Sequence, residues 1–171
     1  HAMELAGELG RLLDQVQTER LDFEALEGLV PDAYAAHWQE TLGFLKILTE
    51  TWPAVLDGEG AIDPAERRNR LLHARGAAGR RDPPADPVIA AGSTGSIPAT
   101  ADLLATVAGL PAGYVVLPGL DRILDAPSWA SLDAGHPQFG LRQLLQRLDV
   151  DRMDVGEWPS SVDVAGAAAG E

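Results

Sequence analysis

Apolar residues recur every three or four positions in the first third of the chain, and this spacing predicts helices there. The first stripe falls within 4–18 and consists of Leu5, Leu9, Leu12, Leu13 and Val16. A short helix capped by Asp22 is expected over 22–29. A longer one, opened by Pro31 and kinked or ended at Pro53, is expected over 32–56.

The next helix has a clear start signal in Asp63-Pro64-Ala65-Glu66, which places an N-cap, a first-turn proline and an acidic third position in order. We expect this helix to decay into the glycine-containing run 76–81. Three prolines within 82–87 exclude regular structure. They predict a hinge between a helical subdomain, residues 4–81, and an α/β subdomain, residues 88–158.

The second half of the chain changes pattern. Val88–Ala91 and Tyr114–Leu117 are short apolar runs that flank a helical stretch over 99–110. Strand, helix and strand in that order predict a parallel pair with a crossover helix, and continuous apolar strands predict burial on both faces. A helix over 138–148 and a further short strand over 152–158 are expected after it.

The fold class expected from these elements is α/β and mostly helical, with a helical N-terminal subdomain followed by a small parallel βαβ unit. Residues 1–3 are interpreted as a vector scar and residues 159–171 as a disordered tail. No run of about 18 apolar residues is present, so no membrane span is expected. The lack of cysteine excludes disulfides and iron–sulfur ligation within the chain and fits a reducing, cytoplasmic compartment.

The net charge of −13 would repel a nucleic-acid backbone if it were spread evenly. The basic residues cluster instead within 61–85, the one block with more bases than acids. Its arginines are the candidate contacts to DNA phosphates: Arg67, Arg68, Arg70, Arg75, Arg80 and Arg81. An ordinary solvated helix face, or contacts to other parts of a longer protein, would use the same residues.

A glycine- and hydroxyl-rich loop follows the first strand and is a second candidate for a phosphate contact, because amides near a helix start attract anions. It consists of Gly92, Ser93, Thr94, Gly95 and Ser96. A tight structural turn is the competing interpretation, since Pro98 follows and no lysine is nearby.

Other residues that often carry chemistry have simpler interpretations. His37, His73 and His136 lack metal-site spacing, and His136 suits a turn. The loop does not match a nucleophile elbow, so no serine hydrolase is indicated. Asp121 and Asp125 suit capping or solvation. The tryptophans, Trp38, Trp52, Trp129 and Trp158, fit core packing better than base stacking.

Five stretches together resemble the N-terminal half of AddB-type double-strand break repair proteins of the alphaproteobacterial type. They are HWQETLGFLKILTETWPAVL (37–56), DPAERRNRLL (63–72), PVIAAGSTGSIPATADLLATVAGLP (87–111), VVLPGLD (115–121) and HPQFGLRQLL (136–145). The resemblance implies an internal fragment of a superfamily 1 helicase-like fold. It also implies an AddA-type partner subunit, contacts to the remainder of the AddB chain, and contact with DNA.

The same resemblance implies that this piece is not a catalyst and carries no cofactor. In active relatives an acidic pair follows the strand equivalent to Val88–Ala91, where it holds Mg²⁺ and a water. Here the loop offers no carboxylate before Asp102, and the single lysine, Lys46, has no phosphate loop around it. Two alternatives stay open: a protein-interaction module without DNA contact, and an enzyme that binds a nucleotide at 92–96.

Overall fold

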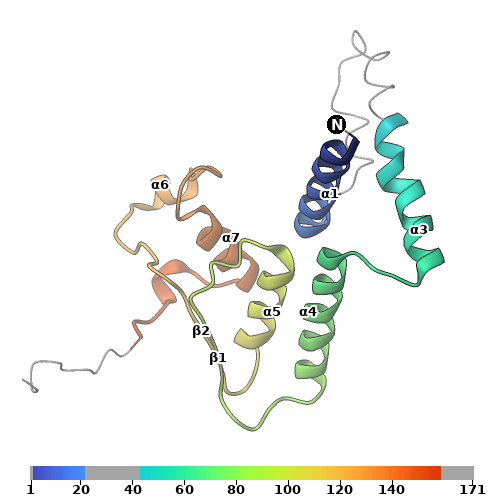
Figure 1. Cartoon of the computed structure of the whole chain (residues 1–171). Coiled ribbons are helices and arrows are strands. Elements are labelled where there is room, and N and C mark those ends of the chain that lie inside the picture. The colour runs from blue at the N-terminus through green and yellow to red at the C-terminus, as the bar shows by residue number, and fades with distance from the viewer. Residues whose placement is uncertain (1, 22–42, 159–171) are drawn as a thin grey trace, which may run out of the picture.

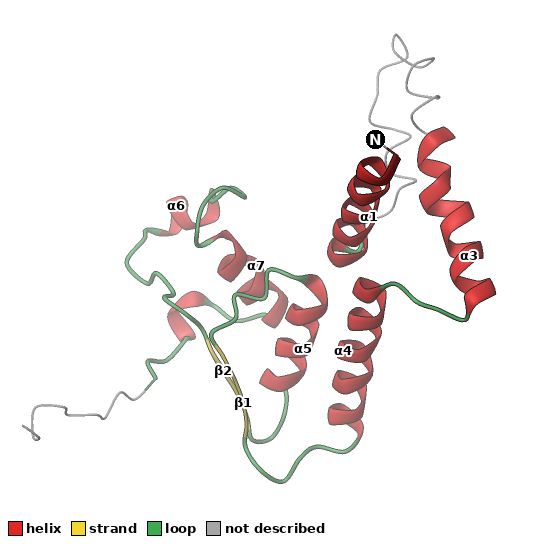
Figure 2. Ribbon diagram, in the orientation of Figure 1, coloured by secondary structure: helices red, strands yellow, loops and turns green. Residues whose placement is uncertain are grey.

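The computed structural model describes residues 2–21 and 43–158, and this part of the chain is mostly helical with one small sheet (Figure 2). The elements are α1 (Ala2–Glu19), the π-helix η3 (Ile47–Thr51), α3 (Trp52–Glu59), α4 (Pro64–Arg81), β1 (Val88–Ala91), α5 (Pro98–Ala108), β2 (Gly113–Val116), α6 (Ala126–Ala130), α7 (Phe139–Leu148) and the 3-10 helix η4 (Arg152–Asp154). The predicted α/β class is confirmed. The helix predicted over 22–29, the first part of the 32–56 helix, and the predicted tail lie outside the described residues.

The sheet consists of β1 and β2, which run parallel with Val88 opposite Gly113 and Ala91 opposite Val116. α5 connects the two strands, as the sequence predicts. β1 is confined by the proline before it and by Gly92 after it, whose φ of 80° is one that glycine adopts without strain.

The main core lies between this sheet, α5 and α7. Its buried centre is Ala101, Leu104 and Leu144, against which strand residues Ala90 and Val115 pack. The opposite sheet face is open, with Ile89 54% and Tyr114 52% exposed. The prediction that both faces are buried is therefore wrong, because the described helices cover one face only.

α4 runs on through Gly76 to Arg81, so the predicted decay at Gly76 is wrong. A Cβ at Gly76 would lie 3.1 Å from Oγ1 of Thr106 on α5. Glycine therefore lets the two helices approach closely, and they lie side by side (Figure 1). This packing joins elements on either side of the Pro-rich segment 82–87, and the division into two subdomains stays a prediction.

Two further predictions are wrong. The strand expected over 152–158 is replaced by η4, because Asp151 accepts a hydrogen bond from the Met153 amide and turns the backbone. Trp52 and Trp158 are exposed rather than in the core, while Trp129 is half-buried. Trp38 lies outside the described residues.

α1 buries Leu13 and leaves Leu5 and Leu12 exposed, so its apolar stripe is covered in part by the described residues. The N-cap position of α4 is Asp63, as predicted. Its carboxylate makes no capping hydrogen bond and instead accepts from Trp52 Nε1 (2.9 Å) and Gln17 Nε2 (2.8 Å). Among the described helices, none combines the length and apolar character that crossing a membrane requires.

Candidate functional site

The six candidate arginines all lie on α4, but they point in different directions. Arg68 donates from Nη2 to Oγ1 of Thr18 on α1 (2.6 Å), and Arg80 donates from Nη1 to Oγ1 of Thr106 on α5 (2.6 Å). These two arginines flank the buried side of the helix and tie it to its neighbours. Both arginines therefore make contacts that hold α4 against its neighbouring helices.

The other four arginines are exposed, as Arg80 also is, but none of them bonds to a neighbouring helix within the described residues. Arg70 pairs with Glu66 one turn earlier on the same helix (2.7 Å). Arg67, Arg75 and Arg81 are exposed, and within the described residues no side-chain hydrogen bond or ion pair engages them. At about 1.5 Å per residue, the 67–81 stretch spans roughly 21 Å of helix surface. We call Arg67, Arg75 and Arg81 the outer arginines.

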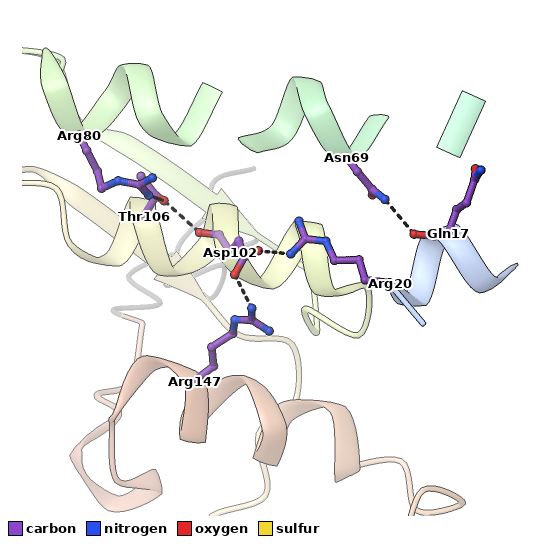
Figure 3. A network of polar contacts seen from close by, with 7 residues as sticks. All are labelled: Gln17, Arg20, Asn69, Arg80, Asp102, Thr106 and Arg147. Carbon is purple, nitrogen blue, oxygen red and sulfur yellow. Dashed lines mark hydrogen bonds and ion pairs between the residues drawn. The ribbon is translucent and has the colours of Figure 1, made fainter. Parts of the chain in front are cut away.

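A polar network connects three helices at Asp102 of α5 (Figure 3). Arg20 Nη1 donates to Oδ2 of Asp102 and Arg147 Nη2 donates to Oδ1, both at 2.5 Å. Burial raises the pKa of Asp102 more than any other single influence. Hydrogen bonds and charges from the two arginines together outweigh burial, so the pKa lies below its ordinary value.

Arg20 reaches this network because α1 ends in a tight left-handed cap. The φ angle of Arg20 is 53°, which is unusual for a residue with a side chain. The Leu21 amide donates a hydrogen bond to the Val16 carbonyl (2.9 Å) and closes the cap. On α4, Asn69 Nδ2 donates to the Gln17 carbonyl (2.8 Å) and satisfies another free group at this end. The sequence does not mark Arg20, Asp102 and Arg147 as a group, because they are far apart along the chain.

Two hollows lie along α4 beside this network. One, of about 470 Å³, lies between α4 and α5 and is lined in part by Gly76, Arg80 and Thr106. The other, of about 600 Å³, lies at the end of α1 and is lined in part by Arg20 and Asn69. His73 lines both hollows. The sequence pattern gives His73 no role, because no local motif marks it.

The loop Gly92–Ser96 packs as a structural turn. Gly95 has φ 63°, and a Cβ there would lie 2.9 Å from Cδ1 of Leu144 on α7. The Gly95 amide donates to Oγ of Ser93 (3.2 Å), which occupies one of the amides an anion would use. Within the described residues, no hydrogen bond or ion pair links this loop to the candidate arginines, so the two predicted sites are not joined by a polar contact.

The acidic residues near α6 cap turns, as predicted. Backbone hydrogen bonds, chiefly from Leu124, lower the pKa of Asp121. The Ser128 amide and hydroxyl lower the pKa of Asp125, which is the N-cap of α6. His136 accepts from the Gln138 amide through Nδ1 (3.1 Å) in a turn. In residues 2–21 and 43–158, no group of three or more His, Asp or Glu side chains is placed to hold a metal ion.

Comparisons of the chain with protein-family models, with curated proteins and with solved structures found no match.

Proposed function

We propose that this chain is a non-catalytic, helicase-like part of an AddB-type subunit, which contacts DNA and an AddA-type partner in cytoplasmic double-strand break repair and recombination. The support is the resemblance of five separated stretches. The β1–α5–β2 unit also fits the order expected where a helical insertion returns to a helicase-like core.

The outer arginines carry the DNA part of the proposal. Within residues 2–21 and 43–158, no ion pair or side-chain hydrogen bond engages Arg67, Arg75 or Arg81, in a chain whose net charge is −13. Unpaired cations on a rigid helix are suited to phosphate oxygens, since each contact releases condensed counterions. Paired arginines such as Arg68 and Arg80 would first have to give up their present hydrogen bonds.

The non-catalytic part rests on the chemistry of the 92–96 loop. Gly95 must keep its left-handed backbone against Leu144, and its amide is already bonded to Ser93. Alcohol groups do not replace a pair of carboxylates as Mg²⁺ ligands, and Asp102 is engaged by two arginines. ATP with Mg²⁺ should leave the melting temperature unchanged, and a saturable rise of several degrees would contradict this.

The decisive experiment measures binding of a labelled forked duplex to the full chain across a range of salt concentrations. Replacing the three outer arginines by alanine should make the salt dependence shallower by about one unit per arginine. The matched control is Arg11→Ala/Lys46→Ala/Arg122→Ala, which removes three exposed cations that already pair with surface acids. An unchanged slope in the outer-arginine variant, or equal loss in the control, would contradict the proposal.

A second candidate function is a pure interaction module without DNA contact, and the open sheet face favours it. Ile89 and Tyr114 lie opposite each other in the register and are both about half exposed. Parallel sheets are almost always covered on both faces. If this candidate is right, Ile89→Thr/Tyr114→Thr should weaken binding to the purified remainder of the complex while fork binding is absent in every variant.

A further inference from the structure

We propose that a third hollow, between α1 and the helical segment formed by η3 and α3, binds an arylalkylamine, a small molecule that combines an apolar ring with an ammonium group. The hollow has a volume of about 470 Å³, within the range of about 300–1,000 Å³ that is usual for small-ligand pockets. Its lining includes neither a candidate arginine nor any residue of the loop 92–96. The inference is therefore independent of the proposed function.

The walls of this hollow are apolar and come from stretches that are far apart in sequence. α1 contributes Leu9 and Leu13, and η3 contributes Ile47 and Leu48. Leu13 and Leu48 are 8% and 6% exposed, whereas Ile47 is 43% exposed. The lining thus combines buried and exposed side chains, so a ligand that enters from solvent can cover apolar surface, which favours binding.

The wall formed by η3 has an unusual backbone. The Trp52 amide donates to the Ile47 carbonyl, five residues earlier, so this turn is wider than an α-helical one. Pro53 follows at once and has no amide to donate, which accounts for the break in the α-helical pattern. Such π-helical turns are rare and are frequent at functional sites.

The polar groups of the hollow favour a cation. Both charged residues that line it are acidic, Asp14 on α1 and Asp63 at the start of α4. The Asp63 carboxylate accepts from Gln17 Nε2 (2.8 Å) and Trp52 Nε1 (2.9 Å), so its position is fixed. Within residues 2–21 and 43–158, no hydrogen bond or ion pair engages the Asp14 side chain. Two carboxylates beside an apolar wall attract an ammonium group and repel an anion.

Trp52 links the apolar and acidic parts of the hollow. Its indole is among the lining groups, is 38% exposed, and is held through Nε1 by Asp63. Indole is the most favourable aromatic partner for a cation and also packs against flat rings. A ligand with both a ring and an ammonium group therefore matches this lining better than a neutral ring or an aromatic acid does.

The test compares three ligands that share one ring and differ in charge: tryptamine is a cation at neutral pH, indole is neutral and indole-3-acetate is an anion. Each is titrated into the full chain at low salt and followed by isothermal titration calorimetry. Tryptamine should bind saturably and about tenfold more tightly than indole, because only the cation gains from the two carboxylates. Indole-3-acetate should bind more weakly than indole.

Two glycines of α1 provide a matched pair of variants. Gly10 lines the hollow and Gly7 does not, and a Cβ added at either position would meet nothing within 4 Å. Gly10→Leu should fill the hollow and weaken tryptamine binding by about tenfold or more. Gly7→Leu should bind tryptamine as wild type does. Both changes add the same side chain and favour the helix equally, so a difference between them reports the hollow and not the folding of α1.

A second pair of variants tests the charge. Asp14→Asn removes one of the two lining acids, and Asp57→Asn removes an exposed acid of α3 that does not line the hollow. Asp14→Asn should lower the affinity for tryptamine by about threefold to tenfold and leave the affinity for indole unchanged. Retained indole binding also shows that the hollow is still formed. Asp57→Asn should change neither affinity.

The inference is overturned if wild type does not bind tryptamine saturably, or if Gly10→Leu binds it as tightly as Gly7→Leu does. Equal affinities for the three ligands also overturn it, because the acidic residues would then play no part in binding. The same holds if Asp14→Asn and Asp57→Asn lower the affinity for tryptamine equally. Each of these outcomes is independent of fork binding, which alone tests the outer arginines.

Discussion

Arg20 at the end of α1 and Asp102 in the middle of α5 form an ion pair, with Nη1 and Oδ2 2.5 Å apart. Arg147 of α7 binds the other carboxylate oxygen at the same distance. One carboxylate thus fixes the relative placement of three helices that are remote in sequence. Each of the three side chains is 35–44% exposed, so solvent screens the charges and the contribution to stability is modest.

Replacing Asp102 by asparagine should lower the free energy of unfolding by about 1 kcal/mol, because two guanidinium groups lose an anionic partner. Urea denaturation followed by circular dichroism measures this. The control is Asp86→Asn in the exposed Pro-rich segment, which should change stability little. Equal losses in the two variants would mean that the network does not stabilise the fold.

The same carboxylate should make stability depend on pH at the acid end. Its folded-state pKa is lowered, so the unfolded chain binds the proton more readily. The stabilisation is therefore present above the unfolded pKa of about 3.9 and disappears as pH falls through the lower folded value. Between about pH 5 and pH 2, wild type should lose more stability than Asp102→Asn, and parallel profiles would contradict the assignment.

Thr106 is a buried link between α4 and α5. Its hydroxyl accepts from Arg80 (2.6 Å) and donates to the Asp102 carbonyl (2.9 Å). A double-mutant cycle with Thr106→Val and Arg80→Met should give a coupling energy of about 1 kcal/mol, because each single change removes the same hydrogen bond. Additive effects would show that the two side chains act independently.

Two glycines with nearly the same backbone angle provide a matched pair. At Gly95, with φ 63°, an added Cβ would lie 2.9 Å from Leu144, whereas at Gly119, with φ 61°, it would meet nothing within 4 Å. Gly119→Ala should cost about 1 kcal/mol of unfolding free energy from backbone strain alone. Gly95→Ala should cost more, because Leu144 must also move, and equal losses would show that the loop does not pack on α7.

Leu144 is at the centre of the core and is 1% exposed. Leu144→Ala should reduce the free energy of unfolding by about 2–5 kcal/mol, because it leaves a cavity beneath the sheet. Leu71→Ala on the outer side of α4 is the control, since that side chain is 58% exposed and its loss should matter little. A small effect at Leu144 would mean that α7 is not part of the stable core.

Local signals in the sequence predicted the helix and strand ends that are marked by proline or glycine. β1 has the predicted bounds, Val88 to Ala91, because proline and glycine delimit it. The start of α4 at Pro64 follows from a proline suited to the first helical turn. The end of α4 was not predicted, because Gly76 looks like a helix breaker until the closeness of Thr106 is known.

At the candidate site too, local sequence signals do not reveal contacts between different helices. Composition and charge identified all six arginines of α4, but the period of the helix alone does not reveal which of them neighbouring helices engage. The hydrogen bond of Arg80 is made to Thr106, which is 26 residues away in sequence. The hollow at the end of α1, which His73 lines, depends on the left-handed turn at Arg20, and no single-sequence pattern marks an arginine in that conformation.

The parallel pairing of β1 and β2 constrains the order in which the chain can fold. A hairpin can close locally, but a parallel pair forms only after the whole connection has crossed the sheet. The entropy of closing that loop is lost before the strands gain their hydrogen bonds, whereas α5 gains its own from residues four positions away. We therefore expect α5 to be organised early with Ala101 and Leu104 facing inward, so that it serves as the template on which the two strands assemble late.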